Sequence, residues 1–104
     1  MNVILFDCEA NLDGIIRSMC ICPCKIGEKP FIGKTYKYIV RDQYDIDCIN
    51  AKNDRLLKFM DEFLEPSDEQ FIGTFYECTS EMMKIVKRYK NTVFVSHALD
   101  NDLM

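Results

Sequence analysis

The sequence has no long hydrophobic run and no basic segment at its start. The apolar stretch near the N-terminus lasts only four residues, Val3 to Phe6. A signal peptide needs a longer apolar core behind positive charges, and a membrane helix needs about 20 apolar residues. We therefore expect a cytoplasmic protein with no membrane partner, whose cysteines are reduced rather than joined in a disulfide framework.

Positive charge is also scarce. Against 13 Lys and Arg residues stand 17 Asp and Glu residues, which gives a net charge of −4. Such a chain does not hold nucleic acid by neutralising phosphates and releasing counterions, so we expect no direct nucleic-acid partner. It suits a basic protein partner, including one that itself handles DNA or RNA. The single histidine, His97, has no convincing nucleophile to serve, so no catalytic triad is expected.

The composition is that of one ordinary globular domain spanning residues 1–104, with 48% hydrophobic and 29% charged residues. Apolar alternation predicts several strands, and a capped apolar stripe late in the chain predicts a helix. The expected fold is α+β, with a small antiparallel, barrel-like sheet and one C-terminal helix. A domain of this size is marginally stable, so a bound zinc ion would stabilise it usefully.

The expected strands span residues 3–8, 15–24, 35–41, 44–50, 71–77 and 92–96. Residues 55–64 fit either a helix or a strand, and the hairpin signal at 51–54 slightly favours the strand. The C-terminal helix is expected to begin at Thr79 or Ser80, either of which can cap it, and to end near Lys90.

Three of the six cysteines stand at alternate positions of the second expected strand: Cys20, Cys22 and Cys24. Alternate side chains leave the same face of a strand, so their sulfurs can converge. In a reducing compartment the usual reason to gather thiolates is a metal ion, and a structural zinc needs four ligands. We assign the ligands as Cys20, Cys22, Cys24 and Cys48. The fourth ligand could also be Cys8, Cys78 or His97. The competing interpretation is that the cysteines pack as small hydrophobic residues.

Acidic residues follow the first and the last expected strands. Asp7 and Glu9 stand in Phe-Asp-Cys-Glu, and Asp100 follows the last strand closely. This pattern resembles two motifs of the DnaQ-like 3′–5′ exonucleases, in which a strand-borne Asp-x-Glu and a later Asp hold two magnesium ions. The resemblance implies a divalent-metal-dependent, exonuclease-like domain with Asp7, Glu9 and Asp100 as ligands. Ala98 replaces the Asn of that family, and the sequence holds no third motif. The competing interpretation is a strand ending in solvated acids and a polar tail.

Two patterns of basic residues do not predict a functional site. Gly33-Lys34-Thr35, preceded by Gly27, does not form a phosphate loop, because the glycine spacing is wrong and a strand rather than a helix follows. The expected helix carries four basic residues near its C-terminal end, where positive charge interacts favourably with the helix dipole. They would form a solvated face: Lys84, Lys87, Arg88 and Lys90.

The middle of the chain combines acids with tyrosines. Asp45 and Asp47 are expected to project outward from the strand 44–50, near Tyr36 and Tyr38, which share one face of the strand 35–41. Aromatic residues anchor a docking surface, and carboxylates steer it to a basic partner. We therefore assign a partner-binding surface to Tyr36, Tyr38, Asp45 and Asp47.

Residues from about 15 to 65 resemble small phage and mobile-element proteins with an SH3-type barrel. The resemblance rests on Gly33-Lys34-Thr35-Tyr36, an Asn53-Asp54 turn and the pair Phe59 and Phe63. Several compact acidic proteins of this kind are anti-CRISPR inhibitors, so it implies a non-catalytic binding module. The predicted function is that of a monomeric, phage-encoded inhibitor in the host cytoplasm. It would bind a host nuclease such as a CRISPR effector and block its nucleic-acid binding. The exonuclease-like domain is the alternative from a different class.

Overall fold

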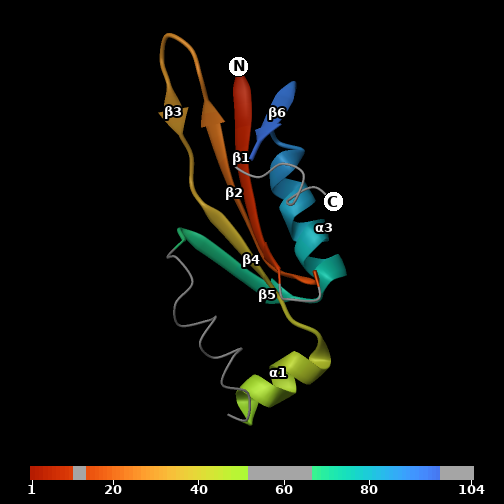
Figure 1. The fold of residues 1–104 in the computed structure, drawn as a ribbon. Coiled ribbons are helices and arrows are strands. Elements are labelled where there is room, and N and C mark those ends of the chain that lie inside the picture. Colours follow the sequence, from red (N-terminus) through yellow and green to blue (C-terminus); the bar gives the residue numbers. More distant parts are fainter. Residues whose placement is uncertain (11–13, 52–66, 97–104) are drawn as a thin grey trace.

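The computed structural model describes residues 1–10, 14–51 and 67–96. Within this part a six-stranded sheet is accompanied by two helices, α1 (Gln43–Asn50) and α3 (Phe75–Val86) (Figure 1). The strands are β1 (Asn2–Ala10), β2 (Ile16–Lys25), β3 (Phe31–Ile32), β4 (Tyr36–Val40), β5 (Glu69–Gly73) and β6 (Thr92–Val95). Neither helix of the described part has the length and apolar character that crossing a membrane requires.

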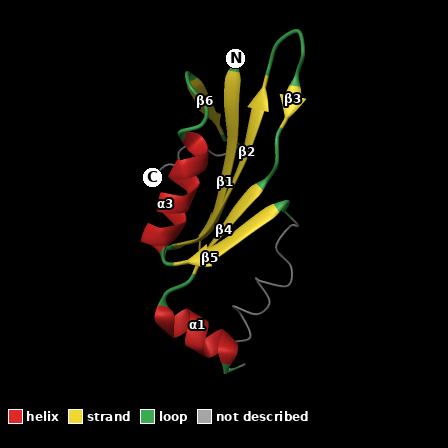
Figure 2. Ribbon diagram, turned by 180° about the vertical axis from the view of Figure 1, so that it is seen from behind, coloured by secondary structure: helices red, strands yellow, loops and turns green. Residues whose placement is uncertain are grey.

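The sheet is mixed and open. Its strands lie in the order β5-β4-β2-β1-β6, and the short β3 pairs with β2. β2 is antiparallel to β1 and β4, whereas β6 is parallel to β1 and β5 is parallel to β4. The α+β class is confirmed, but the antiparallel barrel is wrong. Between β5 and β6 the chain passes through α3 along one face, which leaves these two strands at opposite edges (Figure 2).

α3 packs on one face of the sheet and buries the centre of that face (Figure 1). The core there contains Ile4, Ile21, Tyr38, Cys78 and Ile85. Because side chains alternate along a strand, the even-numbered residues of β1 from Ile4 to Cys8 face the helix, and so do Met19 and Ile21 of β2. The opposite face therefore carries both acids of β1 and the alternate cysteines of β2.

Four of the predicted strands are confirmed. Those expected at 3–8, 15–24, 35–41 and 92–96 correspond to β1, β2, β4 and β6. The strand expected at 71–77 is only partly right, because β5 ends at Gly73 and the helix follows immediately. Several other predicted features lie outside the described residues: the segment 55–64, the Asn53-Asp54 turn, Phe59, Phe63, His97 and Asp100.

α3 begins earlier than predicted, and its cap shows why. The Thr74 hydroxyl accepts a hydrogen bond from Glu77 N at 3.2 Å, while the Glu77 carboxylate accepts one from Thr74 N at 3.1 Å. This capping box satisfies two backbone donors at the start of the helix. The predicted start at Thr79 or Ser80 is therefore wrong, and both residues lie inside the helix. The helix also ends at Val86 rather than near Lys90.

Residues 43–50 form the helix α1 and not the predicted strand. Asp42 Oδ1 accepts a hydrogen bond from Asp45 N at 2.9 Å, and Asp45 Oδ2 accepts one from Asp42 N at 3.3 Å. These reciprocal bonds resemble a capping box and fix the first turn of the helix. The Asp45 carboxylate also pairs with Arg17 Nη1 at 2.5 Å, which joins α1 to β2. Local capping and this ion pair outweigh the strand-like alternation of the sequence.

Candidate functional site

Asp7 and Glu9 project from the C-terminal half of β1. Both side chains are exposed, whereas Phe6 and Cys8 pack against the core under α3. The two acids therefore lie on the face of the sheet that α3 does not cover. Residues two apart on a strand are about 6.6–6.8 Å from each other, so these carboxylates are neighbours. Carboxylate oxygens are the protein ligands that suit Mg²⁺ and Mn²⁺.

β6 runs beside β1 toward these acids. The parallel ladder begins with Asn2 opposite Thr92 and ends with Leu5 opposite Val95. Asp7 lies two residues beyond this last pair, in the direction in which β6 also runs. β6 itself therefore points toward the level of Asp7. Asp100, the third acid of the expected set, lies outside the described residues, as does His97.

β2 supplies the neighbours of the two acids on the same face. Cys20 is paired with Asp7 and Ser18 with Glu9, and side chains paired in this way have Cβ atoms about 4.5–5.5 Å apart. On the other side of Cys20, β4 places Lys37 opposite it. Ser18 and Lys37 are buried, whereas Cys20 is half-buried. The acids thus stand at the exposed end of a polar row that becomes buried toward β4.

The cysteines of β2 lie on one face, as their spacing predicts, and two of them are in contact. Cys22 Sγ and Cys24 Sγ are 3.9 Å apart, and Cys22 Sγ is 3.5 Å from the carbonyl oxygen of Gly33. Burial is the main cause that raises the pKa of the Cys22 thiol to about 11, and the hydrogen bond with Cys24 adds to it. Cys22 is therefore a protonated thiol at neutral pH.

The other cysteines lie on different elements. Cys48, the fourth assigned zinc ligand, is on α1, and Cys8 faces the core under α3. Cys78 is buried and donates to the carbonyl oxygens of Ile39 and Gly73, at 3.3 and 3.5 Å. Among the described residues no group of three or more His, Cys, Asp or Glu side chains could hold a metal ion. Cys8 and Cys78 pack as small hydrophobic residues, and the four-cysteine zinc site stays a prediction.

The four residues assigned to partner binding do not form one exposed surface. Tyr38 is 3% exposed in the core, and Asp45 is 4% exposed in its ion pair with Arg17. Tyr36 is half-buried on the α3 side of the sheet, and Asp47 is exposed on α1. The helix is the reason for the separation of the two acids. Residues two apart on a strand point the same way, but on a helix they point about 200° apart.

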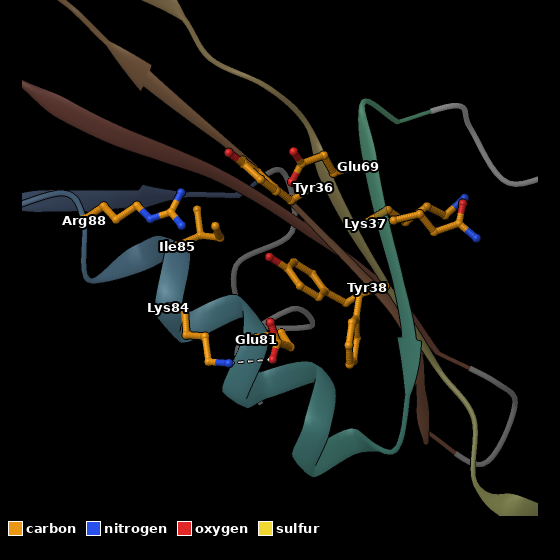
Figure 3. Close-up of a pocket in the computed structure, with 10 residues that line it drawn as sticks. Tyr36, Lys37, Tyr38, Glu69, Glu81, Lys84, Ile85 and Arg88 are labelled. Atoms are coloured by element: carbon orange, nitrogen blue, oxygen red, sulfur yellow. Dashed lines mark hydrogen bonds and ion pairs between the residues drawn. The ribbon is translucent and has the colours of Figure 1, made fainter.

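A cavity of about 210 Å³ lies between α3 and the strands β4 and β5 (Figure 3). Aromatic residues of the sheet and charged residues of the helix line it, among them Tyr36, Tyr38, Phe71, Glu81, Lys84 and Arg88. On the helix side, Lys84 Nζ is 2.7 Å from the Glu81 carboxylate. On the sheet side, burial raises the pKa of Tyr38 to about 12. The sequence indicated the basic side of this helix. It did not indicate that Tyr36 and Tyr38 lie opposite these helix residues, because their proximity depends on how α3 packs on the sheet.

A comparison of the chain with protein-family models, curated proteins and solved structures finds no match. An assignment of function therefore depends on the residues of this chain and on their arrangement in the sheet.

Proposed function

We propose that the protein is a divalent-metal-dependent phosphodiester hydrolase of the 3′–5′ exonuclease type, with Asp7, Glu9 and Asp100 as metal ligands. The observation that supports this function best is the parallel pairing of β6 with β1. The two motifs that resemble DnaQ-like exonucleases stand at opposite ends of the sequence. One is carried by β1 and the other directly follows β6, so the pairing of these strands is the arrangement that a shared site requires.

The chain after β6 is long enough for Asp100 to reach the acids of β1. Asp7 lies two residues past the last pair of the parallel ladder, a distance of about 6.6 Å along the strand. Asp100 is five residues after Val95, and five extended residues span up to about 17 Å. The available length exceeds the required length more than twofold, so the tether does not prevent the three carboxylates from meeting.

The residues fit divalent cations. Asp7 and Glu9 are exposed, and their oxygens are hard ligands of the kind that Mg²⁺ and Mn²⁺ prefer. Bound ions would stabilise the charge on the attacking and leaving oxygens of a phosphodiester. Asp7 and Glu9 would hold the ions from β1, and Asp100 from the segment that follows β6 in the sequence. A chain with a net charge of −4 also needs such cations to receive the end of a nucleic-acid strand.

The arrangement supports the non-catalytic inhibitor less well. Two of the four residues assigned to its docking surface, Tyr38 and Asp45, are buried, and the exposed Asp47 lies on α1, away from the tyrosines. In the described part of the chain, nothing marks one surface as the contact for a CRISPR effector. Inhibition of a host nuclease therefore stays a prediction of the sequence.

A nuclease assay tests the proposed hydrolase. The full chain is incubated with single-stranded DNA labelled at its 5′ end, with Mn²⁺ in one arm and EDTA in the other. We expect stepwise shortening from the 3′ end with Mn²⁺ only. Asp7→Asn should abolish it, because the substitution removes a charged ligand at an exposed position.

Asp47→Asn provides the matched control, since it removes one exposed acid from α1. This variant should keep the activity of the unaltered chain. Shortening that persists in Asp7→Asn would identify a contaminating enzyme and contradict the proposal. A complete lack of activity with Mn²⁺ at high protein concentration would contradict it as well.

A further inference from the structure

Cys22 and Cys24 form a preformed pair of thiols near the end of β2. Their sulfurs are 3.9 Å apart, and the buried Pro23 between them has a fixed φ angle. Gly33 packs against the same backbone: its N–H donates to Pro23 O at 2.7 Å, and a Cβ at Gly33 would lie only 2.6 Å from that oxygen. The close packing restrains the backbone that carries both sulfurs.

The distance between these sulfurs suits a single metal ion. Metal–thiolate bonds are about 2.3 Å long, so one ion can join two sulfurs up to about 4.6 Å apart. The observed 3.9 Å falls within this limit, and the sulfurs need to separate by only about 0.7 Å for the two bonds to become collinear. Thiolates are soft ligands, and among the ions they select are Cu(I) and Zn²⁺.

The number of ligands distinguishes between these two ions. A structural zinc requires four ligands. In the described ranges of the chain, no cluster of three or more metal-ligating side chains occurs. Cu(I) is a soft ion with a filled d shell, and two thiolates satisfy it. The two sulfurs that the structure brings into contact, those of Cys22 and Cys24, are therefore enough ligands for Cu(I).

The surroundings of the pair favour such an ion. On β1, Leu5 is paired with Cys22 and Val3 with Cys24, and β3 places Ile32 opposite Cys24. The side chains of these neighbours are apolar. The oxygens that the structure places against the two sulfurs are backbone carbonyls, that of Gly33 at 3.5 Å from Cys22 Sγ and that of Cys22 at 3.5 Å from Cys24 Sγ. Cys24 is half-buried, so the pair is open to solvent on one side and an ion can enter.

We propose that Cys22 and Cys24 form a two-thiolate binding site for a soft monovalent metal ion, Cu(I). On binding, each thiol releases its proton to solvent and each sulfur donates an electron pair to the ion. The copper stays Cu(I) and neither sulfur is oxidised. The site differs in metal and ligand number from the expected four-cysteine zinc site, and it is independent of the proposed hydrolase.

A competition titration tests the site. The reduced full chain is titrated without oxygen with Cu(I) held by bicinchoninate, and the colour of the copper–bicinchoninate complex reports how much copper the protein removes. We expect one Cu(I) per chain. Cys24→Ser should lose this ion, and X-ray absorption of the wild-type complex should show two sulfur neighbours. Cys22→Ser should also lose the Cu(I) ion. Because Cys22 is buried, circular dichroism checks that this variant is still folded.

Cys8→Ser is the matched control, because Cys8 is half-buried on the neighbouring strand but faces the core under α3. It should bind Cu(I) as the wild type does. Binding that survives in a folded Cys24→Ser variant would overturn the proposal, and so would equal loss in Cys8→Ser. Loss in Cys20→Ser, with three sulfur neighbours in the wild-type spectrum, would replace the two-thiolate site by a three-thiolate one.

Discussion

Leu5 of β1 and Val95 of β6 are the last pair of a parallel ladder that stops two residues before Asp7. The two strands come from the beginning and the end of the described chain. They meet because α3 carries the chain along one face of the sheet, from β5 at one edge to β6 at the other (Figure 1). The last residues of β6 thereby lie beside β1 just before its two acids, and the proposed hydrolase depends on this pairing.

The Arg17–Asp45 ion pair should contribute strongly to stability. It joins β2 to α1, and the two side chains are 19% and 6% exposed. Removal of one partner from a buried ion pair costs about 3–5 kcal/mol, because the other charge is left buried and unpaired. Since Arg17 is partly solvated, we expect a value at the lower end of this range: Asp45→Ala should lower the free energy of unfolding by about 3 kcal/mol. Urea denaturation measures this change in the free energy of unfolding. Asp47→Ala, at an exposed position, should change it by less than about 0.5 kcal/mol, and equal effects would refute the role of the pair.

The start of α3 can be located by three threonine variants. Thr74→Ala removes the hydroxyl that accepts from Glu77 N and should lower the free energy of unfolding by about 1 kcal/mol, whereas Thr74→Ser keeps that acceptor. Thr79 lies inside the helix, so Thr79→Ala removes no cap and should cost less. Thermal denaturation compares the three variants. A larger loss in Thr79→Ala than in Thr74→Ala would place the helix start at Thr79.

Tyr38 should make the fold sensitive to alkaline pH. Its pKa is raised to about 12, mainly by burial, from about 10 in the unfolded chain. The folded state therefore keeps this proton when the unfolded state has lost it. The resulting contribution to stability is complete below about pH 10 and is lost as the pH rises toward 12.

Urea midpoints measured between about pH 9 and pH 11 check this dependence on the Tyr38 pKa. The fall in stability should be shallower for Tyr38→Phe than for the unaltered chain. Tyr76 is 79% exposed, so Tyr76→Phe should keep the full slope and serves as the control. The same slope in all three proteins would show that Tyr38 does not cause the dependence.

The sequence contained enough local information for most strands and for both helix starts. Alternation located β1, β2, β4 and β6. The Thr74-x-x-Glu77 and Asp42-x-x-Asp45 patterns are the signals that begin α3 and α1. Each pattern overlaps a segment in which apolar residues also alternate, and that alternation predicts a strand. Capping is the stronger signal in both places, since it satisfies backbone donors that a strand would pair differently.

The arrangement of the strands could not be predicted in the same way. The contact between Leu5 and Val95, and the position of Cys20 beside Asp7, depend on strand order and register. These are set by packing between residues far apart in the sequence. The positions of the residues assigned to partner binding depend on the same packing, because Tyr38 is buried by α3 and Asp45 by its ion pair with Arg17.

Manganese binding tests the proposed metal site most directly. Mn²⁺ is titrated into the full chain, and electron paramagnetic resonance separates free from bound ion. We expect Asp7→Asn, Glu9→Gln and Asp100→Asn each to weaken Mn²⁺ binding by more than the roughly 10- to 100-fold typical of changes outside the ligand shell. Asp47→Asn should bind as the wild type does. Unchanged Mn²⁺ binding in Asp7→Asn or in Asp100→Asn would contradict a site shared by β1 and the segment after β6.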